Sequence, residues 1–343
     1  MTKANRSPAA RSRRMMVRLL VAALAALLLY FAFRGIDWSE LGAQLAEADL
    51  ATLVLAWALM SFGMALRSVR WGILVGVRTK PGFPTMFWAT TAGYVGNSYL
   101  PARAGDVMRS VLLGRYMGVA RTFVLGTTLT ERVLDTIVVV VLAGGVVSFL
   151  PWAPGWLTSS SIGFSIAAFI ALVALLAAPK LAGWVERLAA RLPIAESWRA
   201  NLVAMWNDFF TGSLAMQNRL DAALFAVLTV VVWTIDTTCV YTVATALGLD
   251  LVTPQIALLL IVALALSSVA PSTPGYVGVY QFVAVSVLAP FAVARTEALA
   301  LVLLFQAVIY AAVTPWGLIG LWRLGGLAAT KNGDNDIGVK AET

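Results

Sequence analysis

Six charged residues in the first half of the chain stand at spacings that could bind a charged ligand within a membrane. Three follow the stretch YVGNSYLP and three interrupt the apolar run LGTTLTERVLDTIVVVV: Arg103, Asp106, Arg109, Glu131, Arg132 and Asp135. A guanidinium group binds phosphate oxygens through paired hydrogen bonds, and a carboxylate can orient that guanidinium or hold a cation. These residue types predict a polar cavity or substrate path. The alternative is a set of structural salt bridges between helices.

The second three charges lie deep in their apolar segment, about ten to fourteen residues from its start. On a helix this is roughly 15 to 20 Å. Glu131 and Asp135 share a helix face, and Arg132 can pair with Asp135. Because a charge at a lipid-exposed membrane centre costs at least about 2.5 kcal/mol, these side chains must face protein or a polar cavity. Asp236, in VVWTIDTTCVY, is a further acid at membrane depth, either a partner for Arg132 or a proton or ion relay.

Proline and glycine interrupt the apolar segments at two places. The first break follows YVGNSYL at Pro101, and the second is the sequence APSTPGYVGVYQ with Pro271, Pro274, Gly275 and Gly278. Proline removes a backbone donor and glycine accepts unusual dihedral angles, so both residues can unwind a helix. Irregular backbone at membrane depth is tolerated only where it is buried or lines a cavity. Both breaks are therefore expected to reach a site.

Two polar residues of the second break, Tyr280 and Gln281, are further candidates for contact with a ligand. Tyr276 and Tyr280 could equally belong to an aromatic belt at the membrane interface. Gln281 and Gln306 are the types that form hydrogen bonds between membrane helices, which is the favoured interpretation for both.

The composition restricts the class of protein. Of 343 residues 60% are apolar and only 12% are charged, with a mean hydropathy of +0.84, whereas soluble domains carry about 25% charged residues. Uninterrupted apolar stretches reach the length needed to cross about 30 Å of hydrocarbon. We therefore expect an all-α polytopic membrane protein. The chain has no His and a single Cys239, so neither a His-based metal site nor an intrachain disulfide is expected.

The basic residues predict the topology, because they collect on the cytoplasmic side. A basic N-terminus, 1–16, precedes an uncleaved first span. The predicted spans are Val17–Phe33, Leu50–Leu66, Thr122–Leu150, Ser160–Ala178, Ala222–Leu247 and Ala298–Trp322. A segment at 179–220 and a disordered tail at 326–343 are placed in the cytoplasm. This topology puts 22 of the 25 basic residues inside, so the net charge of +8 does not indicate nucleic-acid binding.

Two further apolar stretches, 83–121 and 253–295, are too broken for simple spans. Each is expected to form a re-entrant helical hairpin, the first entering from the cytoplasm and the second from outside. Six full helices and two hairpins make eight apolar segments in a single transmembrane domain, 17–325. The halves, about 50–150 and 222–322, then have similar order and opposite orientation, which is typical of inverted-repeat transporters.

The sequence LPARAGDVMRSVLLGRYMGVARTFVLGTTLTERVLD resembles the hallmark segment of the lysylphosphatidylglycerol synthase transmembrane (flippase-like) family, formerly grouped as UPF0104. The family pattern is roughly P-x-R-x-G-[DE]-x-x-R and then E-R-x-x-D. It is met by Pro101, Arg103, Gly105, Asp106, Arg109, Glu131, Arg132 and Asp135. A second pattern, P-x-x-P-G-x-x-G, is met by Pro271, Pro274, Gly275 and Gly278. Many members carry an Arg-Glu pair there, where this chain has Tyr280-Gln281, so a role that relies on that Glu does not carry over.

The resemblance covers about residues 15–325 and implies a flippase that moves an anionic or modified phospholipid, or another lipid phosphate, between leaflets. Arg103, Arg109 and Arg132 would engage the phosphate; Asp106, Glu131 and Asp135 would orient them. In relatives a separate C-terminal domain synthesises the lipid. This chain ends about twenty residues after its last predicted span, so no synthase activity is expected.

The expected partners are membrane lipids and possibly a separate lipid-modifying enzyme, with no cofactor, no metal and no nucleic acid. No GxxxxGK[ST] motif is present, so energy would come from a gradient, from downhill transfer or from a partner. The expected location is the cytoplasmic (inner) membrane of a bacterium or archaeon. The alternative function is a membrane accessory protein or enzyme of lipid or glycolipid modification without transport. It is less favoured, because the sequence has no His.

Overall fold

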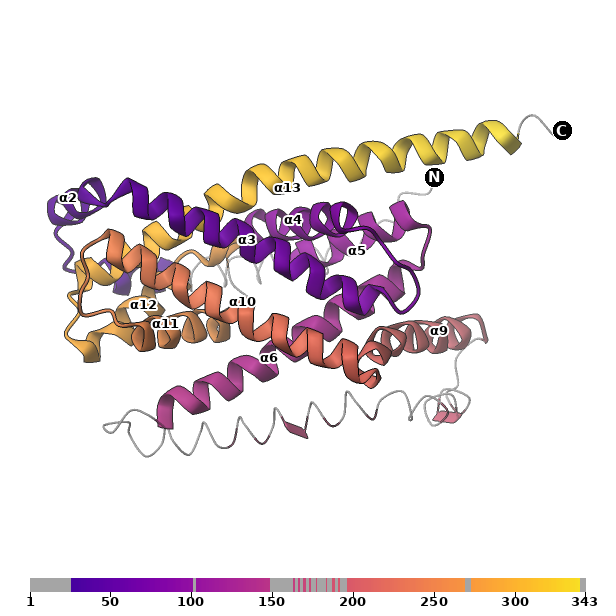
Figure 1. Ribbon diagram of the computed structural model, residues 1–343, viewed down its shortest axis with the longest axis horizontal. Helices are drawn as coiled ribbons and strands as arrows, with labels where there is room; N and C mark the ends of the chain where they lie inside the picture. Colours follow the sequence, from indigo (N-terminus) through magenta and orange to yellow (C-terminus); the bar gives the residue numbers. More distant parts are fainter. Residues whose placement is uncertain are drawn as a thin grey trace, which may run out of the picture.

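The computed structural model describes residues 26–100, 103–148, 196–268 and 273–339, together with single positions between 163 and 191. Every regular element in these ranges is helical (Figure 1). The α-helices are α2 (Trp38–Glu47), α3 (Leu50–Val75), α4 (Phe83–Tyr99), α5 (Ala104–Met117), α6 (Arg121–Ser148), α9 (Glu196–Ser213), α10 (Arg219–Ala246), α11 (Pro254–Ser267), α12 (Val279–Leu288) and α13 (Arg295–Val339). Short 3-10 turns are η3 (Leu214–Gln217), η4 (Pro274–Tyr276) and η5 (Ala289–Phe291).

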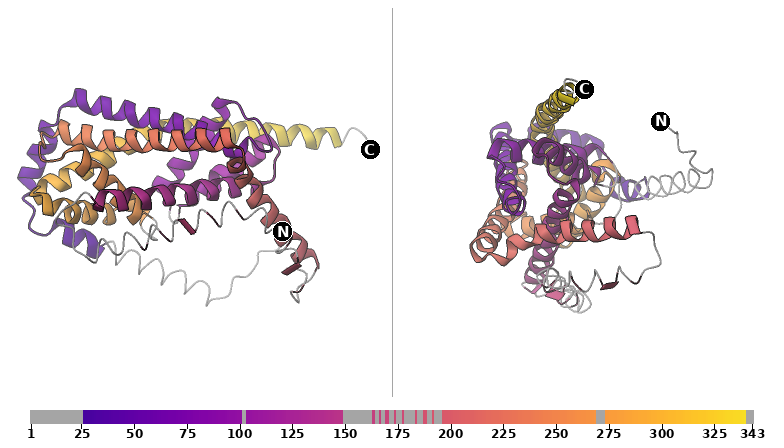
Figure 2. Two further views of the ribbon diagram at one scale, coloured as in Figure 1. Left: turned by 60° about the horizontal axis from the view of Figure 1, so that its bottom comes forward. Right: turned by 90° about the vertical axis from the view of Figure 1, so that its right-hand side faces the viewer.

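Within the described ranges, three helices are long and apolar enough to cross a membrane: α3, α10 and the part Arg295–Gly325 of α13. They run along the long axis of the molecule, and α9 is inclined to them (Figure 2). α6 also has 28 residues, about 42 Å at 1.5 Å per residue, but charges interrupt its middle. The chain is thus an all-α polytopic membrane protein, as its composition predicts.

Two helical hairpins occupy opposite ends of the bundle. α4 and α5 lie at the end near α9, whereas α11 and α12 lie at the end near α2 (Figure 1). The four helices have 10 to 17 residues, about 15 to 26 Å, and are too short to cross about 30 Å of hydrocarbon. Their tips meet inside the bundle, where η4 packs against α4. This is the arrangement predicted for the stretches 83–121 and 253–295.

Each end of the bundle has its own hydrophobic core. Near α2, the buried residues come from α3, α10, α11, α12 and α13, with Cys239, Leu260 and Leu299 among them. Near α9, Trp71 of α3 packs with Leu113 of α5 and with residues of α4, α6 and α10. A hairpin is therefore anchored in each core, and the polar tips are left between the cores.

Glycines allow two helix pairs to approach at backbone distance. A Cβ on Gly105 of α5 would come within 1.9 Å of the Gly93 carbonyl of α4. On α13, a Cβ on Gly320 would come within 2.4 Å of the Trp88 carbonyl, and one on Gly317 within 2.5 Å of Val95. Small residues serve this purpose in membrane helix packing. α4 is consequently held closely between α5 and α13.

Polar caps fix the start of the helices at the α2 end. Asp49 accepts a hydrogen bond from the Thr52 backbone N–H at 2.9 Å and another from the Thr52 hydroxyl. These bonds hold the pKa of the Asp49 carboxyl below its usual value of 3.8. Asp37 caps α2 in the same way, through Ser39 and Glu40. At α11, Thr253 is the cap and Pro254 is the first helical residue, where its missing N–H costs nothing.

The prediction that the second span ends at Leu66 is wrong. α3 continues for nine residues to Val75, so Arg67 and Arg70 lie within the helix and not in a cytoplasmic loop. Arg70 is only 1% exposed. An arginine normally marks the end of a span, but here each guanidinium finds a carboxylate on a neighbouring helix, which makes its burial tolerable.

Other predicted spans compare as follows. α10 agrees with Ala222–Leu247 to within three residues, and α6 covers most of Thr122–Leu150. Of Val17–Phe33 only 26–33 is described, and it is helical. The span Ser160–Ala178 lies largely outside the described residues, and residues 1–16 lie entirely outside them. α13 continues as a helix to Val339, into the tail for which the sequence predicts disorder, because no proline follows Pro315 to stop it.

Candidate functional site

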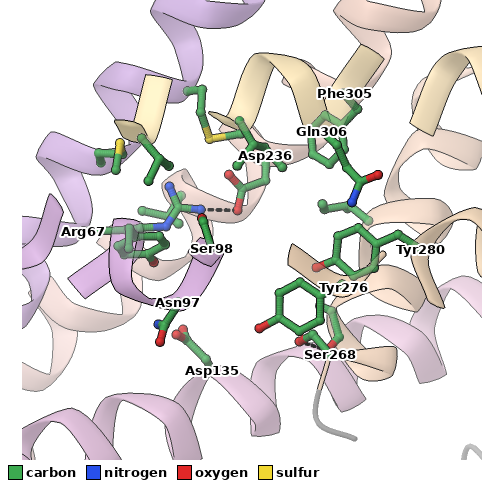
Figure 3. A pocket seen from close by; sticks show the side chains of 18 of the residues that line it. Arg67, Asn97, Ser98, Asp135, Asp236, Ser268, Tyr276, Tyr280, Phe305 and Gln306 are labelled. Atoms are coloured by element: carbon green, nitrogen blue, oxygen red, sulfur yellow. Dashed lines mark hydrogen bonds and ion pairs between the residues drawn. The ribbon is translucent and has the colours of Figure 1, made fainter. Parts of the chain in front are cut away.

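A cavity of about 260 Å³ lies where the two hairpin tips meet the long helices (Figure 3). Its wall is built from α3, α4, α6, α10, α11, α12 and α13, with Arg103 at the start of α5 and Gly275 and Tyr276 of η4. The charged side chains in this wall are Arg67, Arg70, Arg103, Arg132, Asp135 and Asp236.

An ion-pair network of three arginines and three carboxylates lies beside the cavity. Arg70 of α3 donates two hydrogen bonds to Asp135, at 2.7 and 2.9 Å, and one to Glu131 at 2.9 Å. Glu131 also accepts from Arg109 of α5 at 2.7 Å. The Arg109 guanidinium lies 4.3 Å from the centre of the Trp71 ring, a cation–π distance. Arg70, Arg109 and Glu131 are almost completely removed from solvent, whereas the Asp135 side chain is partly exposed to the cavity.

The network continues through Asp106 to Arg132. Asp106 lies 3.7 Å from Nε of Arg109 and accepts two hydrogen bonds from Arg132, at 3.0 and 2.8 Å. Asn97 of α4 donates another at 3.1 Å. The expected pair of Arg132 with Asp135 does not form, because each finds a better-aligned partner on another helix. Three positive and three negative charges cancel, so the network fastens α3, α5 and α6 without a net charge.

A separate ion pair joins Arg67 of α3 to Asp236 of α10 across the cavity wall (Figure 3). Asp236 therefore does not pair with Arg132, the partner considered from the sequence. Its side chain is 12% exposed, and Oδ1 is buried without a hydrogen-bond partner in the described part of the chain.

Arg103 differs from the other arginines of the site. It lies at the tip of the first hairpin in the left-handed conformation, with φ 52°. Its Nη2 donates to the carbonyl and hydroxyl of Ser268, at 2.8 and 2.6 Å, where α11 ends. Within the described ranges it has no carboxylate partner. The five arginines of the site and its network face four carboxylates, so one positive charge is left, and it belongs to Arg103.

Two buried glutamines hold the loop of the second hairpin. Gln281 accepts from the Gly278 backbone N–H at 2.7 Å and donates to Gln306 of α13 at 2.6 Å. Gln306 in turn donates to the Gly275 carbonyl at 2.9 Å. Gly275 and Gly278 have φ 68° and 88°, values that glycine adopts without strain. The prediction that these glutamines bond between helices is confirmed.

Two stacked tyrosines, Tyr276 of η4 and Tyr280 in the first turn of α12, cover one side of the cavity. The Tyr276 and Tyr280 rings lie 4.9 Å apart at an angle of 8°, and Figure 3 shows both hydroxyls pointing into the cavity. Tyr94, Tyr310, Phe305 and Trp233 also contribute to the wall. Tyr276 and Tyr280 thus line the cavity within the bundle and are not confined to an outer belt.

The predicted site residues fall into two groups. Those that line the cavity are Arg103, Arg132, Asp135, Asp236 and Tyr280. Those buried behind its wall are Asp106, Arg109, Glu131 and Gln281. Arg109 is only 1% exposed and cannot reach a ligand from its present position. Gly105 provides the close contact between α4 and α5; Pro101 and Pro271 lie outside the described residues, and of Pro274 the backbone alone is described.

Sequence reasoning missed several residues of the wall, above all Arg67 and Arg70. They stand three apart on one face of α3, in MALRSVRWGIL, which continues as an apolar helix after them. The apolar residues that follow Arg70 could have indicated that the helix continues and that both arginines lie within it. Asn97, Ser98 and Ser268 were also missed, because small polar residues near a break look the same as loop residues.

The fold and the cavity define a polytopic membrane protein with two opposed helical hairpins and a polar, arginine-rich interior. The chain matches the model of the lysylphosphatidylglycerol synthase TM region over residues 15–317. It therefore belongs to that family.

Two curated relatives were found. The chain is 28% identical over 325 residues to "Glycosyltransferase AglD" of Haloferax volcanii, covering 84% of this chain and 51% of that protein. The chain thus spans about half the length of this relative. It is 24% identical over 274 residues to a "UPF0104 membrane protein" of Methanothermobacter thermautotrophicus, covering 75% and 79% of the two chains.

Proposed function

We propose that this protein moves a lipid with an anionic headgroup, either an anionic or modified phospholipid or another lipid phosphate, between membrane leaflets. The observation that carries the proposal is the guanidinium of Arg103, which has no carboxylate partner among the described residues and lies in the wall of the cavity. Family membership agrees with a lipid-related function. The proposed setting is the cytoplasmic membrane of a bacterium or archaeon, with both chain termini in the cytoplasm.

In this proposal Arg103 takes the phosphate. Its present acceptors are the carbonyl and hydroxyl of Ser268, which are neutral, and a phosphate oxygen forms a stronger, charge-assisted bond. Arg132 lines the same cavity and is 26% exposed in its side chain. Its carboxylate partner Asp106 keeps it oriented. The two guanidinium groups would together grip one phosphate, while the acyl chains stay in lipid beyond a lateral opening.

The hairpins suggest how the site would face each leaflet in turn. One hairpin is fastened to α6 by ion pairs of Arg109 and Asp106. The other is fastened to α13 by glutamine bonds. Between their tips runs the contact of Arg103 with Ser268. When a phosphate replaces Ser268 as the partner of Arg103, this contact is lost and one hairpin can move against the other. Energy would come from a gradient, from downhill transfer or from a partner protein.

Leaflet exchange of fluorescent anionic lipids in proteoliposomes tests the proposal. We expect Arg103→Gln to slow exchange at least tenfold, since it removes the only uncompensated charge among the described residues of the site. Arg78→Gln is the matched control, because Arg78 forms its ion pair with Asp208 near the surface and does not line the cavity. Exchange that is equal in liposomes with and without the wild-type protein would refute transport.

A second candidate is a role in lipid glycosylation, favoured by the relative whose name contains glycosyltransferase. As an enzyme, this chain would need a carboxylate free to act as acid or base. Asp135, which lines the cavity, is held by two hydrogen bonds from Arg70, and this argues for the role of an accessory protein that presents the lipid to a separate enzyme. Loss of a glycolipid in a deletion strain, with leaflet exchange absent in liposomes, would favour this second candidate.

A further inference from the structure

We propose that α9 is an in-plane membrane anchor, which lies along the bilayer surface at its end of the bundle with an apolar stripe in the lipid. This surface is outside the cavity, and its role does not depend on the proposed transport. α9 has 18 residues, about 27 Å at 1.5 Å per residue. Figure 2 shows that it is inclined to the long axis along which the spanning helices run.

The apolar stripe of α9 consists of Trp198, Leu202 and Met205. The three side chains are 69%, 45% and 53% exposed. They stand four and three positions apart in the sequence, so they lie on one side of the helix. A contiguous group of large exposed apolar side chains marks a surface that binds another protein or a membrane. The next question is which of these two covers the stripe.

The C-terminal part of α9 is fixed to the bundle. Asp208 accepts a hydrogen bond from Arg78, just after the end of α3, at 2.7 Å, and another from Thr122 in the first turn of α6. Gly212 lies against Thr127 of α6, where an added Cβ would come within 3.0 Å of the Thr127 backbone nitrogen. The apolar stripe lies N-terminal to these contacts, so they leave it exposed.

These contacts place α9 at the level where the spanning helices begin and end. α10 is long and apolar enough to cross a membrane and begins at Arg219, and only residues 214–218 separate it from α9. α3, another such helix, ends at Val75, close to Arg78. Because spanning helices begin and end near the membrane surface, a helix held to these ends lies at that surface.

The surroundings of α9 favour lipid as the occupant. Arg121 and Arg219, at the starts of α6 and α10, are exposed and form no ion pair within the described ranges. Arginines at this height attract lipid phosphates. Leu220 in the first turn of α10 is 79% exposed, so an apolar outer surface begins where the chain leaves α9. Trp198 is of the residue type that collects at membrane interfaces. The partner that fits is a bilayer surface.

An anchor at α9 also holds α6 at a fixed depth. The contact of Gly212 with Thr127 lies one helical turn before Glu131, which joins Arg70 and Arg109 in the ion-pair network. Lipid bound along the apolar stripe therefore keeps the helix that carries this network in place relative to the membrane.

Spin labels on the full chain in liposomes of equal parts phosphatidylcholine and phosphatidylglycerol test the proposal. Leu202→Cys places a label on the apolar stripe, and Ala200→Cys places one on the opposite, also exposed, side of α9. Val227→Cys, on the exposed side of α10, is the reference for lipid. The wild type, in which Cys239 is buried, measures background labelling. The readout is power-saturation EPR with oxygen, which concentrates in lipid, and with a water-soluble nickel complex.

The label at Leu202 should favour oxygen and lie about 5–10 Å below the lipid phosphates. The label at Ala200 should favour the nickel complex, and the label at Val227 should favour oxygen. Equal access of nickel to Leu202 and Ala200 would overturn the proposal. Low access of both reagents to Leu202 would also overturn it, because this result would show that protein, such as a second copy, covers the stripe.

A variant of the stripe tests whether these side chains hold α9 in the lipid. Trp198→Ser/Met205→Ser should move the label at Leu202 toward water, because it removes most of the apolar area beside the label. Trp38→Ser is the matched control, because Trp38 is 63% exposed on α2 at the other end of the bundle, and it should leave the depth at Leu202 unchanged. An unchanged depth in the double variant would refute the anchor.

Discussion

Removal of one carboxylate from the buried ion-pair network should lower the free energy of unfolding more than the loss of an exposed ion pair does. Glu131→Gln keeps the shape of the side chain but removes the charge that Arg70 and Arg109 share, at 2.9 and 2.7 Å. Arg70 keeps Asp135, whereas Arg109 is left with Asp106 at 3.7 Å. Breaking a buried ion pair by removing one partner costs about 3–5 kcal/mol, because the remaining charge is buried without compensation.

The matched comparison is Asp208→Asn, which breaks the pair with Arg78. The Arg78 side chain is 37% exposed, and exposed pairs contribute about 0–1 kcal/mol. Unfolding of both variants in mixed detergent–SDS micelles, followed by circular dichroism, gives the two losses of free energy. The double variant Arg109→Met/Glu131→Gln should be more stable than the sum of its single changes by about 1–3 kcal/mol. A loss for Glu131→Gln no larger than that for Asp208→Asn would refute the reasoning.

Three further predictions test the hairpin, a cap and a core. Gly105→Ala should abolish folding, because its Cβ would lie 1.9 Å from the Gly93 carbonyl. Gly42→Ala is the control, because a Cβ there has no atom within 4 Å, and it should elute like the wild type in size-exclusion chromatography. Asp49 has a pKa below its usual value of 3.8 through its bonds to Thr52, so its contribution to stability is complete above about pH 4 and is lost as the pH falls through the folded pKa. Asp49→Asn keeps the cap but cannot titrate, so stability should fall less at acidic pH than in the wild type. An unchanged dependence of stability on pH would contradict this prediction. Cys239 is 0% exposed, so a maleimide should label it only after unfolding; labelling of the folded protein at the unfolded rate would show that the α10 core is open.

Most of the fold could be predicted from the sequence, because hydropathy and charge indicate which segments lie in the membrane and where they are interrupted. The breaks at Pro101 and at APSTPGYVGVYQ indicated both hairpins, and Glu131, Arg132 and Asp135 indicated a polar interior. What could not be predicted was pairing between helices that are far apart in the chain. Arg67 and Arg70 looked like the end of a span, since their partners Asp236 and Asp135 come from α10 and α6.

Contacts between distant helices also limited what could be predicted of the candidate site. Sequence reasoning identified the residues that gather around the cavity but not which of them face it. Arg109 and Arg132 look alike in the chain, and both were expected to bind phosphate. Only the packing of Arg109 against Trp71 and Glu131 places it behind the wall, while Arg103, held by neutral groups, carries the excess charge.

The long separation between paired charges also has a consequence for how the chain is inserted during synthesis. Arg67 and Asp236 are 169 residues apart and Arg70 and Glu131 are 61 residues apart. At about 5–20 residues per second, these partners emerge about 8–34 s and 3–12 s after the arginines. Until then the two guanidinium groups of α3 are without the carboxylates that pair with them in the folded protein. Both pairs can form only after α6 and then α10 have been synthesised.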